Sequence, residues 1–371
     1  MLTLKRKALT YTKNLFGTRI TPKVVMFVID DYGNIHLHSK AARENLASKG
    51  VPVDQTRFSM YDSLETAEDL EMLFNVLASV KDVNGNHAIF TPFALPANID
   101  FDRVNAEEGK YHYELLPTTF DKLPSHQNAW QLWQEGMRAG IFMPQFHGRE
   151  HLNVKLFEDL LKIKHPHILA NLEERSYAGI HHDINNVGFT EAFSFDQKDE
   201  VLDQKEILAD GLRLFEQVFG YPAIHFNAPG AREHIDLHEV SSLSGIKLVD
   251  TDVVKNEHQG NQTFKKSFNP MGSKNKYGQT QIFRNVVFEP TLDEHNDWVS
   301  KCMVEIEIAF RCHKPAIISS HRVNFCGHID PSIRKKSLGE LGRLLYKMIN
   351  KWPDIEFKSS KGLFKIILDE N

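Results

Sequence analysis

Short apolar runs recur along this chain, each bounded by polar or turn-forming residues. They are rich in Val, Ile and Phe, as buried strands tend to be. The first run, Val24–Ile29, continues directly into Asp30 and Asp31. Seven further runs follow: His87–Phe93, Ile141–Phe146, Ala178–His182, Ala223–Asn227, Lys247–Val253, Asn285–Glu289 and Ala316–Ser320. We predict a buried strand at each of these eight runs.

Apolar residues with helical spacing lie between many of the runs, and we assign them to the core. They predict helices near residues 70–80, 208–218, 299–310 and 338–348. Strands that alternate with helices favour a parallel sheet. Because no linker interrupts the series, we predict an α/β protein with a single distorted (β/α) barrel of seven to eight parallel strands.

Two segments fall outside this alternation. Residues 255–283 are rich in Asn, Gln, Lys and Gly, and we expect a long surface loop there. Residues 96–127 are expected to form another irregular excursion.

Composition narrows the class of protein. The chain has 371 residues, of which 41% are hydrophobic and 25% charged, values typical of a globular protein. The net charge of −5 gives no reason to propose a nucleic-acid partner. Three cysteines without a CxxC pair make neither a disulfide framework nor a zinc knuckle. We therefore expect a reducing, cytoplasmic location.

The N-terminal segment is basic, with Lys5, Arg6, Lys7, Lys13 and Arg19. Polar residues interrupt its apolar positions, so we predict neither a signal peptide nor a transmembrane segment. We interpret residues 1–22 as a solvent-exposed basic segment that precedes a barrel domain of residues 23–371. The alternative is a short basic helix that contacts a membrane or a partner.

Catalytic groups of such barrels lie at the carboxyl ends of the strands. The first run ends in the adjacent carboxylates Asp30 and Asp31. Side chains alternate along a strand, so both can reach one site only if the chain turns there, which Gly33 would permit. The alternative is that an Asp caps the following helix.

His147 and His151 follow the third run and stand four residues apart. On a helical turn this spacing places both imidazoles on one face, where they can bind one metal ion. The HExxH metalloprotease motif has Glu after its first His, whereas this chain has Gly148. The metalloprotease class is therefore excluded.

Later strand ends also carry polar residues. Asn227 could donate to a developing oxyanion or simply form a turn. Asp250 and Asp252 could support a site or pair with lysines. Glu289 precedes a proline and could contact substrate or an arginine. His321 is suited to acid chemistry near neutral pH, unless it is a core histidine satisfied by the backbone.

Three of these segments resemble motifs of the polysaccharide deacetylase family, also called carbohydrate esterase family four, which has the NodB-homology fold. They are Val28-Ile29-Asp30-Asp31, His147-Gly148-Arg149-Glu150-His151 and Ile318-Ser319-Ser320-His321. The resemblance covers residues from about 24 to about 368. Residues 144–151 and 320–325 resemble more closely a polysaccharide (de)acetylase-like subgroup from bacterial surface-polysaccharide regions.

The resemblance implies a metal-dependent hydrolase that removes an acyl group, such as acetyl, from a carbohydrate. Asp30 would be the general base and His321 the general acid. Asp31, His147 and His151 would bind one divalent metal ion. Zn²⁺ is the first choice, and Ni, Co or Fe(II) also suits these ligands. The substrate would be an acetylated oligo- or polysaccharide or a sugar precursor.

The chain also departs from the family pattern. Gly148 replaces the usual Ser or Thr, and the segment 227–230 occupies the place of the motif that supplies an arginine to orient the base. Arg149, Arg232 or Arg322 would have to replace that arginine. We assign Arg149, Asn227, Glu289 and Arg322 to substrate binding. The sequence predicts no oligomeric state.

Other functions remain open. A glycoside hydrolase on a related barrel would use two carboxylates, here Asp30 and Glu289. A barrel that binds sugar without catalysis is a further alternative. A metal amidohydrolase, prompted by His36 and His38, is discounted because that pair lies past the first strand and the last strand ends in His321, where Asp would be needed.

Overall fold

The computed structural model describes residues 4–107 and 109–370. A nine-stranded sheet forms its centre, and eight of the strands follow the order β10-β7-β6-β5-β2-β1-β12-β11. All pairings in this sheet are parallel, and β13 pairs with the first residues of β1. The strands are β1 Lys23–Tyr32, β2 Phe90–Ala94, β5 Gln145–Phe146, β6 His225–Phe226, β7 Leu248–Asp250, β10 Thr280–Ile282, β11 Val286–Val287, β12 Ala316–His321 and β13 Ile355–Phe357.

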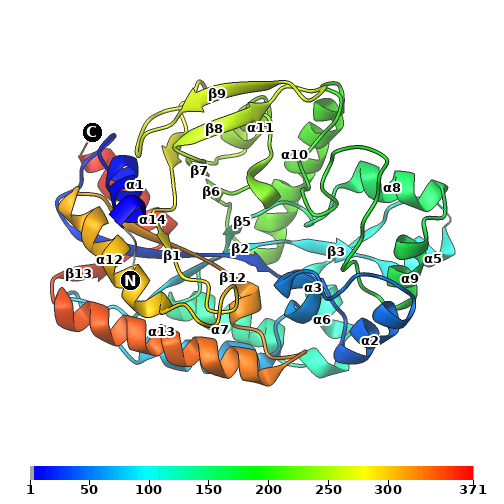
Figure 1. The fold of residues 1–371 in the computed structure, drawn as a ribbon, viewed down its shortest axis with the longest axis horizontal. Coiled ribbons are helices and arrows are strands. Elements are labelled where there is room, and N and C mark those ends of the chain that lie inside the picture. The colour runs from blue at the N-terminus through cyan, green and yellow to red at the C-terminus, as the bar shows by residue number, and fades with distance from the viewer. Residues whose placement is uncertain (1–3, 108, 371) are drawn as a thin grey trace.

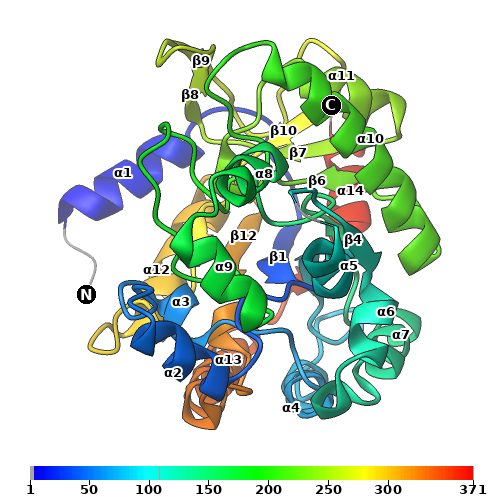
Figure 2. The ribbon, with the colours of Figure 1, turned by 90° about the vertical axis from the view of Figure 1, so that its right-hand side faces the viewer.

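The two edge strands of the sheet, β10 and β11, are consecutive in the chain. Three residues link Ile282 to Val286, so the edges lie no more than about 14 Å apart at this point. The sheet is therefore curled into a distorted β/α barrel, which confirms the predicted fold class. Figures 1 and 2 show helices arranged around these strands.

The central strand β1 has the sequence expected of a strand covered on both faces. Its residues from Val24 to Ile29 are apolar and buried, as parallel strands covered on both sides require. Helices cover the sheet on its outside (Figure 2). The helices are α1 Leu4–Asn14, α2 Lys40–Ser48, α3 Arg57–Tyr61, α4 Ala67–Ala78, α5 Phe101–Ala106, α6 Leu116–Asp121, α7 Ala129–Ala139, α8 Val154–Lys162, α9 Pro166–Glu173, α10 Glu200–Phe219, α11 Leu237–Leu243, α12 Trp298–Arg311, α13 Pro331–Lys351 and α14 Ser360–Asp369.

The four helices predicted from apolar spacing are confirmed as α4, α10, α12 and α13. Their periodic residues lie in the core: Leu70, Leu73, Leu77, Leu208, Leu212, Phe215, Val299, Ile306, Leu338, Leu341, Leu345 and Met348 are all buried. The amphipathic pattern was informative because each helix packs one apolar face on the sheet.

The strand predicted at Ala178–His182 is wrong. No strand forms there, and the segment lies in the connection between α9 and α10. Ala178 packs in a separate apolar cluster with Leu46 and Val51. Gly179 has φ +64°, and its backbone lies against Pro52, so the segment packs on a loop and not beside a strand.

The surface loop predicted at residues 255–283 is also wrong. The segment contains the antiparallel hairpin β8 Val254–His258 and β9 Phe264–Phe268, followed by the sheet strand β10. The predicted excursion at residues 96–127 likewise contains a short hairpin, β3 Ala97–Ile99 with β4 Tyr113–Leu115, and the helices α5 and α6. One predicted strand is thus lost from the central sheet, and β10 joins that sheet from a segment in which no strand was predicted.

The N-terminal segment begins with residues 1–3, which lie outside the described part of the chain. Residues 4–14 form the helix α1, which packs on α12. No helix within residues 4–107 and 109–370 has the length and apolar character needed to span a membrane.

Candidate metal and catalytic site

Polar side chains from seven strands converge at one end of the sheet. Since parallel strands end at the same edge, residues distant in sequence meet there. The contributing residues are Asp30 and Asp31 on β1, His147 after β5, Asn227 after β6, Asp250 on β7, Arg284 after β10, Glu289 after β11 and His321 on β12. Most of them line a cavity of about 590 Å³. Glu289 does not line it and lies behind His321.

The end of β1 turns so that both carboxylates face this site. Asp31 has φ +77°, and the register with β2 shifts between Ile29 and Tyr32. We predicted the turn at Gly33, and Gly33 also has φ +78°, but the positive φ begins at Asp31 itself. Left-handed backbone is uncommon for a non-glycine residue, although Asp and Asn tolerate it best. The turn places Asp30 and Asp31 side by side in one cavity.

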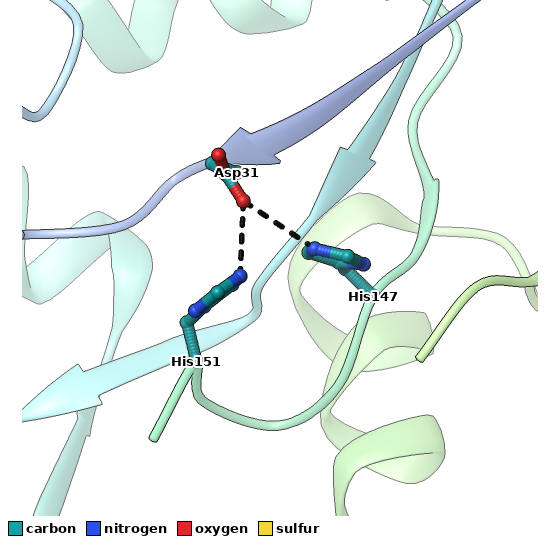
Figure 3. Close-up of side chains that lie close together, drawn as sticks. All are labelled: Asp31, His147 and His151. Atoms are coloured by element: carbon teal, nitrogen blue, oxygen red, sulfur yellow. Dashed lines mark ion pairs between the residues drawn. The ribbon is translucent and has the colours of Figure 1, made fainter. Parts of the chain in front are cut away.

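Asp31, His147 and His151 form a compact cluster (Figure 3). One carboxylate oxygen of Asp31 lies 2.9 Å from Nε2 of His151 and 3.5 Å from Nε2 of His147. Burial raises the pKa of Asp31, but His151 and His147 lower it by more, so it lies well below its usual range. The carboxylate is therefore ionised, as a metal ligand must be.

His147 is held in the orientation that a metal ligand needs. Its Nδ1 donates to the backbone carbonyl of Asn227 at 2.7 Å, which leaves the Nε2 lone pair directed at Asp31. Metal-binding histidines commonly donate their second ring nitrogen in this way. The predicted helical turn between His147 and His151 is wrong, because residues 147–152 form an irregular loop. The loop still brings the two imidazoles together, 5.1 Å between ring centres.

These three side chains fit a divalent cation. One carboxylate oxygen and two imidazole nitrogens lie within 4.8 Å of one another. Among the described residues no further His, Cys, Asp or Glu joins this group. Three protein ligands with positions open to a cavity are typical of catalytic metal sites. Two imidazoles and one carboxylate suit zinc and also iron, cobalt or nickel.

Gly148 allows the loop between the two histidines to take its shape. It has φ +139°, and a Cβ at this position would lie 3.0 Å from the carbonyl oxygen of Glu150. The Ser or Thr expected here from the family pattern would be strained.

We expect Gly148→Ser to lower the free energy of unfolding by about 1–3 kcal/mol and to weaken zinc binding, because the backbone between two ligands must move. Thermal unfolding with and without zinc measures both effects. Gly339→Ala is the control, since Gly339 lies in α13 and a Cβ there has no neighbour within 4 Å. It should be neutral or stabilising. A fully stable Gly148→Ser protein with unchanged zinc affinity would contradict this account.

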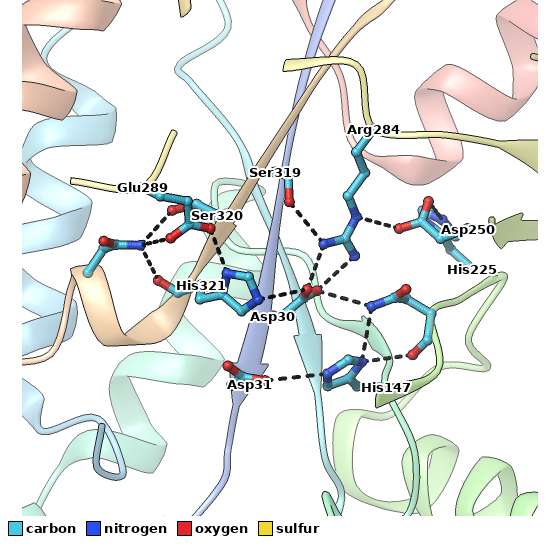
Figure 4. Close-up of polar contacts among 12 residues, drawn as sticks. Asp30, Asp31, His147, His225, Asp250, Arg284, Glu289, Ser319, Ser320 and His321 are labelled. Carbon is cyan, nitrogen blue, oxygen red and sulfur yellow. Dashed lines mark hydrogen bonds and ion pairs between the residues drawn. The ribbon is translucent and has the colours of Figure 1, made fainter. Parts of the chain in front are cut away.

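Asp30 is held by an arginine that sequence reasoning missed. The two Nη atoms of Arg284 donate to the two carboxylate oxygens of Asp30 at 2.6 and 2.8 Å, and Nε donates to Asp250 at 2.7 Å (Figure 4). Burial lowers the pKa of Arg284, but Asp30 and Asp250 raise it by more, so the guanidinium stays charged. Bidentate contact fixes the plane of the Asp30 carboxylate.

Arg284 lies in the short link between the two edge strands β10 and β11. It was missed because β10 falls within the segment that we assigned to a surface loop. The one available signal was that Arg284 directly precedes a predicted strand. That signal is weak, because charged residues commonly flank strands.

Asn227 contacts both Asp30 and the candidate metal ligand His147. Its side-chain amide donates to Asp30 at 3.2 Å, and its backbone carbonyl accepts from His147. Asn227 lines the cavity, as its predicted substrate-binding role requires. Its contacts show in addition that it positions Asp30 and His147.

His321 stands on the other side of Asp30. Its Nε2 lies 3.6 Å from a carboxylate oxygen of Asp30, and its Nδ1 donates to Glu289 at 2.6 Å. Burial lowers the pKa of His321, but Glu289, Asp31 and Asp30 raise it by more, to about 9. His321 is therefore protonated at neutral pH.

Glu289 is a buried partner of His321. Its second oxygen accepts from Arg57 at 2.6 Å and from Asn324 at 2.7 Å. Burial raises the pKa of Glu289, but His321 and Arg57 lower it by more, so Glu289 is ionised. Both of its carboxylate oxygens accept hydrogen bonds within the protein, and Glu289 does not line the cavity.

The structure does not bring the predicted arginines to the cavity. Arg322 is fully buried and pairs with Asp62 and Glu65 at 2.9 and 3.0 Å. Arg149 pairs with Glu150 at 2.7 Å and with Asp210 at 3.1 Å.

Arg232, the third predicted arginine, is half-exposed and lies 3.5 Å from Glu191. None of these arginines lines the cavity or contacts Asp30. We therefore propose no role for them in substrate binding, and it is Arg284 that holds Asp30.

Several cavity residues were not predicted as site residues. Phe58, Tyr177 and Phe189 add aromatic surface, and His36 lies against Tyr177 with 4.9 Å between ring centres. Phe58 comes from the short helix α3, and the others come from the loop after β1 and from the segment 177–190, where sequence patterns are weakest.

Comparison with known proteins finds only distant structural similarities. No protein-family model and no curated protein matches the chain. A structure from Pseudomonas aeruginosa PAO1 described as a probable polysaccharide deacetylase is 8% identical, with a TM-score of 0.49 over 94% of this chain and 92% of that one. One from Parabacteroides distasonis described as a glycoside hydrolase/deacetylase is 9% identical, with a TM-score of 0.48 over 94% and 72%.

A third solved structure, from Mycobacterium smegmatis and described as a polysaccharide deacetylase, is 10% identical, with a TM-score of 0.46 over 95% of this chain and 94% of that one. At such identities and TM-scores the similarity carries no argument about what this protein does. The function proposed below therefore rests on the geometry of the site.

Proposed function

We propose that this protein is a metal-dependent hydrolase that removes an acetyl group from a carbohydrate. The observation that supports this most strongly is that the two adjacent carboxylates at the end of β1, Asp30 and Asp31, have different partners. Asp31 faces two histidines that fit a divalent ion, while its neighbour Asp30 is held by Arg284 and Asn227. On the neighbouring strand β12, His321 lies 3.6 Å from Asp30 and carries a proton. A metal site, a fixed carboxylate base and a protonated acid are the groups that acyl hydrolysis requires.

Asp30 is suited to accept a proton from the attacking water. Arg284 and Asn227 fix its carboxylate, so the base is already oriented when substrate binds. When bound, a divalent cation at Asp31, His147 and His151 would supply Lewis-acid activation of water and of the acyl carbonyl.

His321 is suited to protonate the departing sugar nitrogen or oxygen. Glu289 holds its Nδ1, so Nε2 is the atom that carries the proton toward the cavity. The proposed base and acid lie 3.6 Å apart, so both can reach one acyl group in the cavity.

A carbohydrate substrate suits the cavity. Its volume of about 590 Å³ falls within the range of small-molecule sites. Aromatic side chains and several carboxylates line it, with Arg284 as the only lining arginine among the described residues. Aromatic faces together with hydrogen-bonding groups suit the apolar and hydroxyl faces of a sugar ring better than a phosphate. We therefore propose an acetylated oligosaccharide, polysaccharide or sugar precursor as substrate.

Release of acetate from a panel of N- and O-acetylated oligosaccharides tests this function. We expect release that stops in chelator and returns when Zn²⁺, Co²⁺ or Ni²⁺ is restored. Cleavage of glycosidic bonds that persists in chelator would support the glycoside hydrolase instead. The contacts of Glu289 disfavour that alternative, because the predicted second carboxylate does not reach the cavity. Tight glycan binding without acetate release would favour a non-catalytic barrel.

Glu289 sets the pH range over which His321 can act as an acid. In the wild type we expect activity to fall as pH rises through about 9, the pKa of His321, because the acid then loses its proton. Glu289→Gln removes the largest charge that raises this pKa, so the alkaline limb of kcat/KM should move to lower pH by about 1–2 units. A pH–rate profile of both proteins measures it. An unmoved alkaline limb would show that His321 is not the titrating acid.

A further inference from the structure

Six large apolar side chains are exposed on two neighbouring parts of the chain, and we call them the outer patch. They are Leu9, Leu15, Phe16, Val254, Phe264 and Phe268, each more than half exposed. The rings of Phe16 and Phe268 touch edge to face with 5.7 Å between centroids, which joins the end of α1 to the β8–β9 hairpin. Figure 1 shows this hairpin at the top of the molecule with α1 beside it. Clustered exposed apolar side chains mark an interaction surface more often than scattered ones.

The two faces of the β8–β9 hairpin carry different kinds of side chain. Val254 pairs with Phe268, and His258 with Phe264, so these side chains share one face. The other face carries Lys255 and Glu257, which are buried. The chain therefore buries charged residues beneath the hairpin and exposes two phenylalanines above it. This inverts the arrangement expected of a hairpin that faces only water.

The same surface is strongly basic. Residues 5–19, which include most of α1, contain five lysines and arginines and no acidic residue, although the whole chain has a net charge of −5. Lys5, Leu9 and Lys13 follow one another at four-residue spacing and are exposed, so α1 alternates charge and apolar side chains along one face. Lys266 lies between Phe264 and Phe268 on β9. Within the described residues Lys13 and Lys266 form no ion pair.

The outer patch adjoins the proposed active site. Lys13 lines the cavity, as does Val253, the residue before Val254. A surface that binds this patch would therefore lie at the mouth of the cavity.

We propose that the outer patch docks this protein on the surface of an anionic lipid bilayer. The phenylalanines and leucines would enter the boundary between headgroups and acyl chains, and the lysines would contact lipid phosphates. A second copy of the chain suits the patch less well, because a symmetric contact would place the same cations opposite one another. The inference concerns docking alone and does not depend on the proposed deacetylase activity.

Co-flotation of the full chain with vesicles tests the proposal. We expect binding to an equimolar mixture of phosphatidylcholine and phosphatidylglycerol, and none to phosphatidylcholine alone. Phe264→Ser with Phe268→Ser should weaken binding at least about tenfold, because both rings lose their burial in the bilayer. Lys266→Glu should weaken it by roughly tenfold and high salt should do the same to the wild type.

Matched controls lie on α13, at the opposite edge of the molecule in Figure 1. Tyr346 is 65% exposed and Lys347 is exposed, so Tyr346→Ser and Lys347→Glu make the same kinds of change away from the patch. Both should bind vesicles as the wild type does. Absence of binding to anionic vesicles, equal loss in the α13 variants, or self-association through the patch without vesicle binding would each overturn the proposal. Unchanged circular dichroism of the double variant shows that folding is intact.

Discussion

Asp31→Asn should lose bound metal and activity together, with activity falling by roughly a thousandfold or more. Asp31 supplies the carboxylate of the candidate metal site and lies 2.9 Å from His151. Asn has nearly the same size as Asp but no charge. Without the carboxylate of Asp31, His147 and His151 alone would bind a divalent ion only weakly. Elemental analysis of the purified variant beside the wild type gives the metal content, and acetate release gives the activity.

The choice of Asn matters because of the backbone at this position. Asp31 has φ +77°, a conformation that Asn adopts more readily than Ala. Asp31→Ala would combine loss of the ligand with backbone strain, whereas Asp31→Asn isolates the ligand. Asp30→Asn is the matched control: we expect it to keep the metal and lose activity. Full metal content in Asp31→Asn would refute the assignment of Asp31 as a ligand.

Arg284→Met should lower the free energy of unfolding at neutral pH by about 3–5 kcal/mol and kcat by about a hundredfold. The guanidinium joins two buried carboxylates, Asp30 and Asp250. Met has a similar length but no charge, so Asp30 keeps only the contact with His321 at 3.6 Å, and Asp250 keeps only the hydrogen bond with His225. The base would also lose its fixed orientation. Denaturant unfolding and steady-state kinetics measure the two effects.

The stability loss should depend on pH. Burial raises the pKa of Asp250, but Arg284 and His225 lower it by more, so its folded-state pKa is depressed. A depressed carboxylate stabilises the fold above its ordinary pKa of about 3.9 and loses that contribution as pH falls through the folded value. The difference between wild type and Arg284→Met should therefore shrink toward acid pH. A pH-independent difference would point to lost packing on Phe93, over which Arg284 lies.

Arg284→Lys separates charge from geometry. Lysine keeps the positive charge but cannot contact both oxygens of Asp30 in a bidentate manner. We expect it to recover part of the stability and little of the kcat. Equal recovery of both would show that charge alone, and not orientation of Asp30, is what Arg284 provides.

Local sequence patterns predict many of the strands and helices of this fold. The six apolar residues before Asp30 predict β1 because a strand covered on both faces needs no alternation. The periodic leucines of α4, α10, α12 and α13 predict those helices because each buries one face. The proposed metal ligands could also be predicted from the sequence. Because the strands of a parallel barrel end at one edge, Asp31 and His147 could be assigned to one site without a local motif.

Other features depend on contacts that no local pattern records. Arg284 meets Asp30 from 254 positions away, through a strand of three residues set in a polar segment. Arg322 follows His321 directly, yet its side chain is buried against Asp62 and Glu65. The strand β12 ends at His321 and a short 3-10 helix begins at Arg322, so these neighbours in sequence do not share a site.

The chemical types of the site, two carboxylates and three histidines at strand ends, were determined by the sequence itself. Tertiary structure decided how Asp30 and Asp31 share one cavity, since the positive φ of Asp31 is held by packing around it. It also decided which arginine holds the base. The physical reason is that residue type and spacing fix which strands can form, whereas the partner of a buried charge is set by whichever distant segment the closed barrel brings against it.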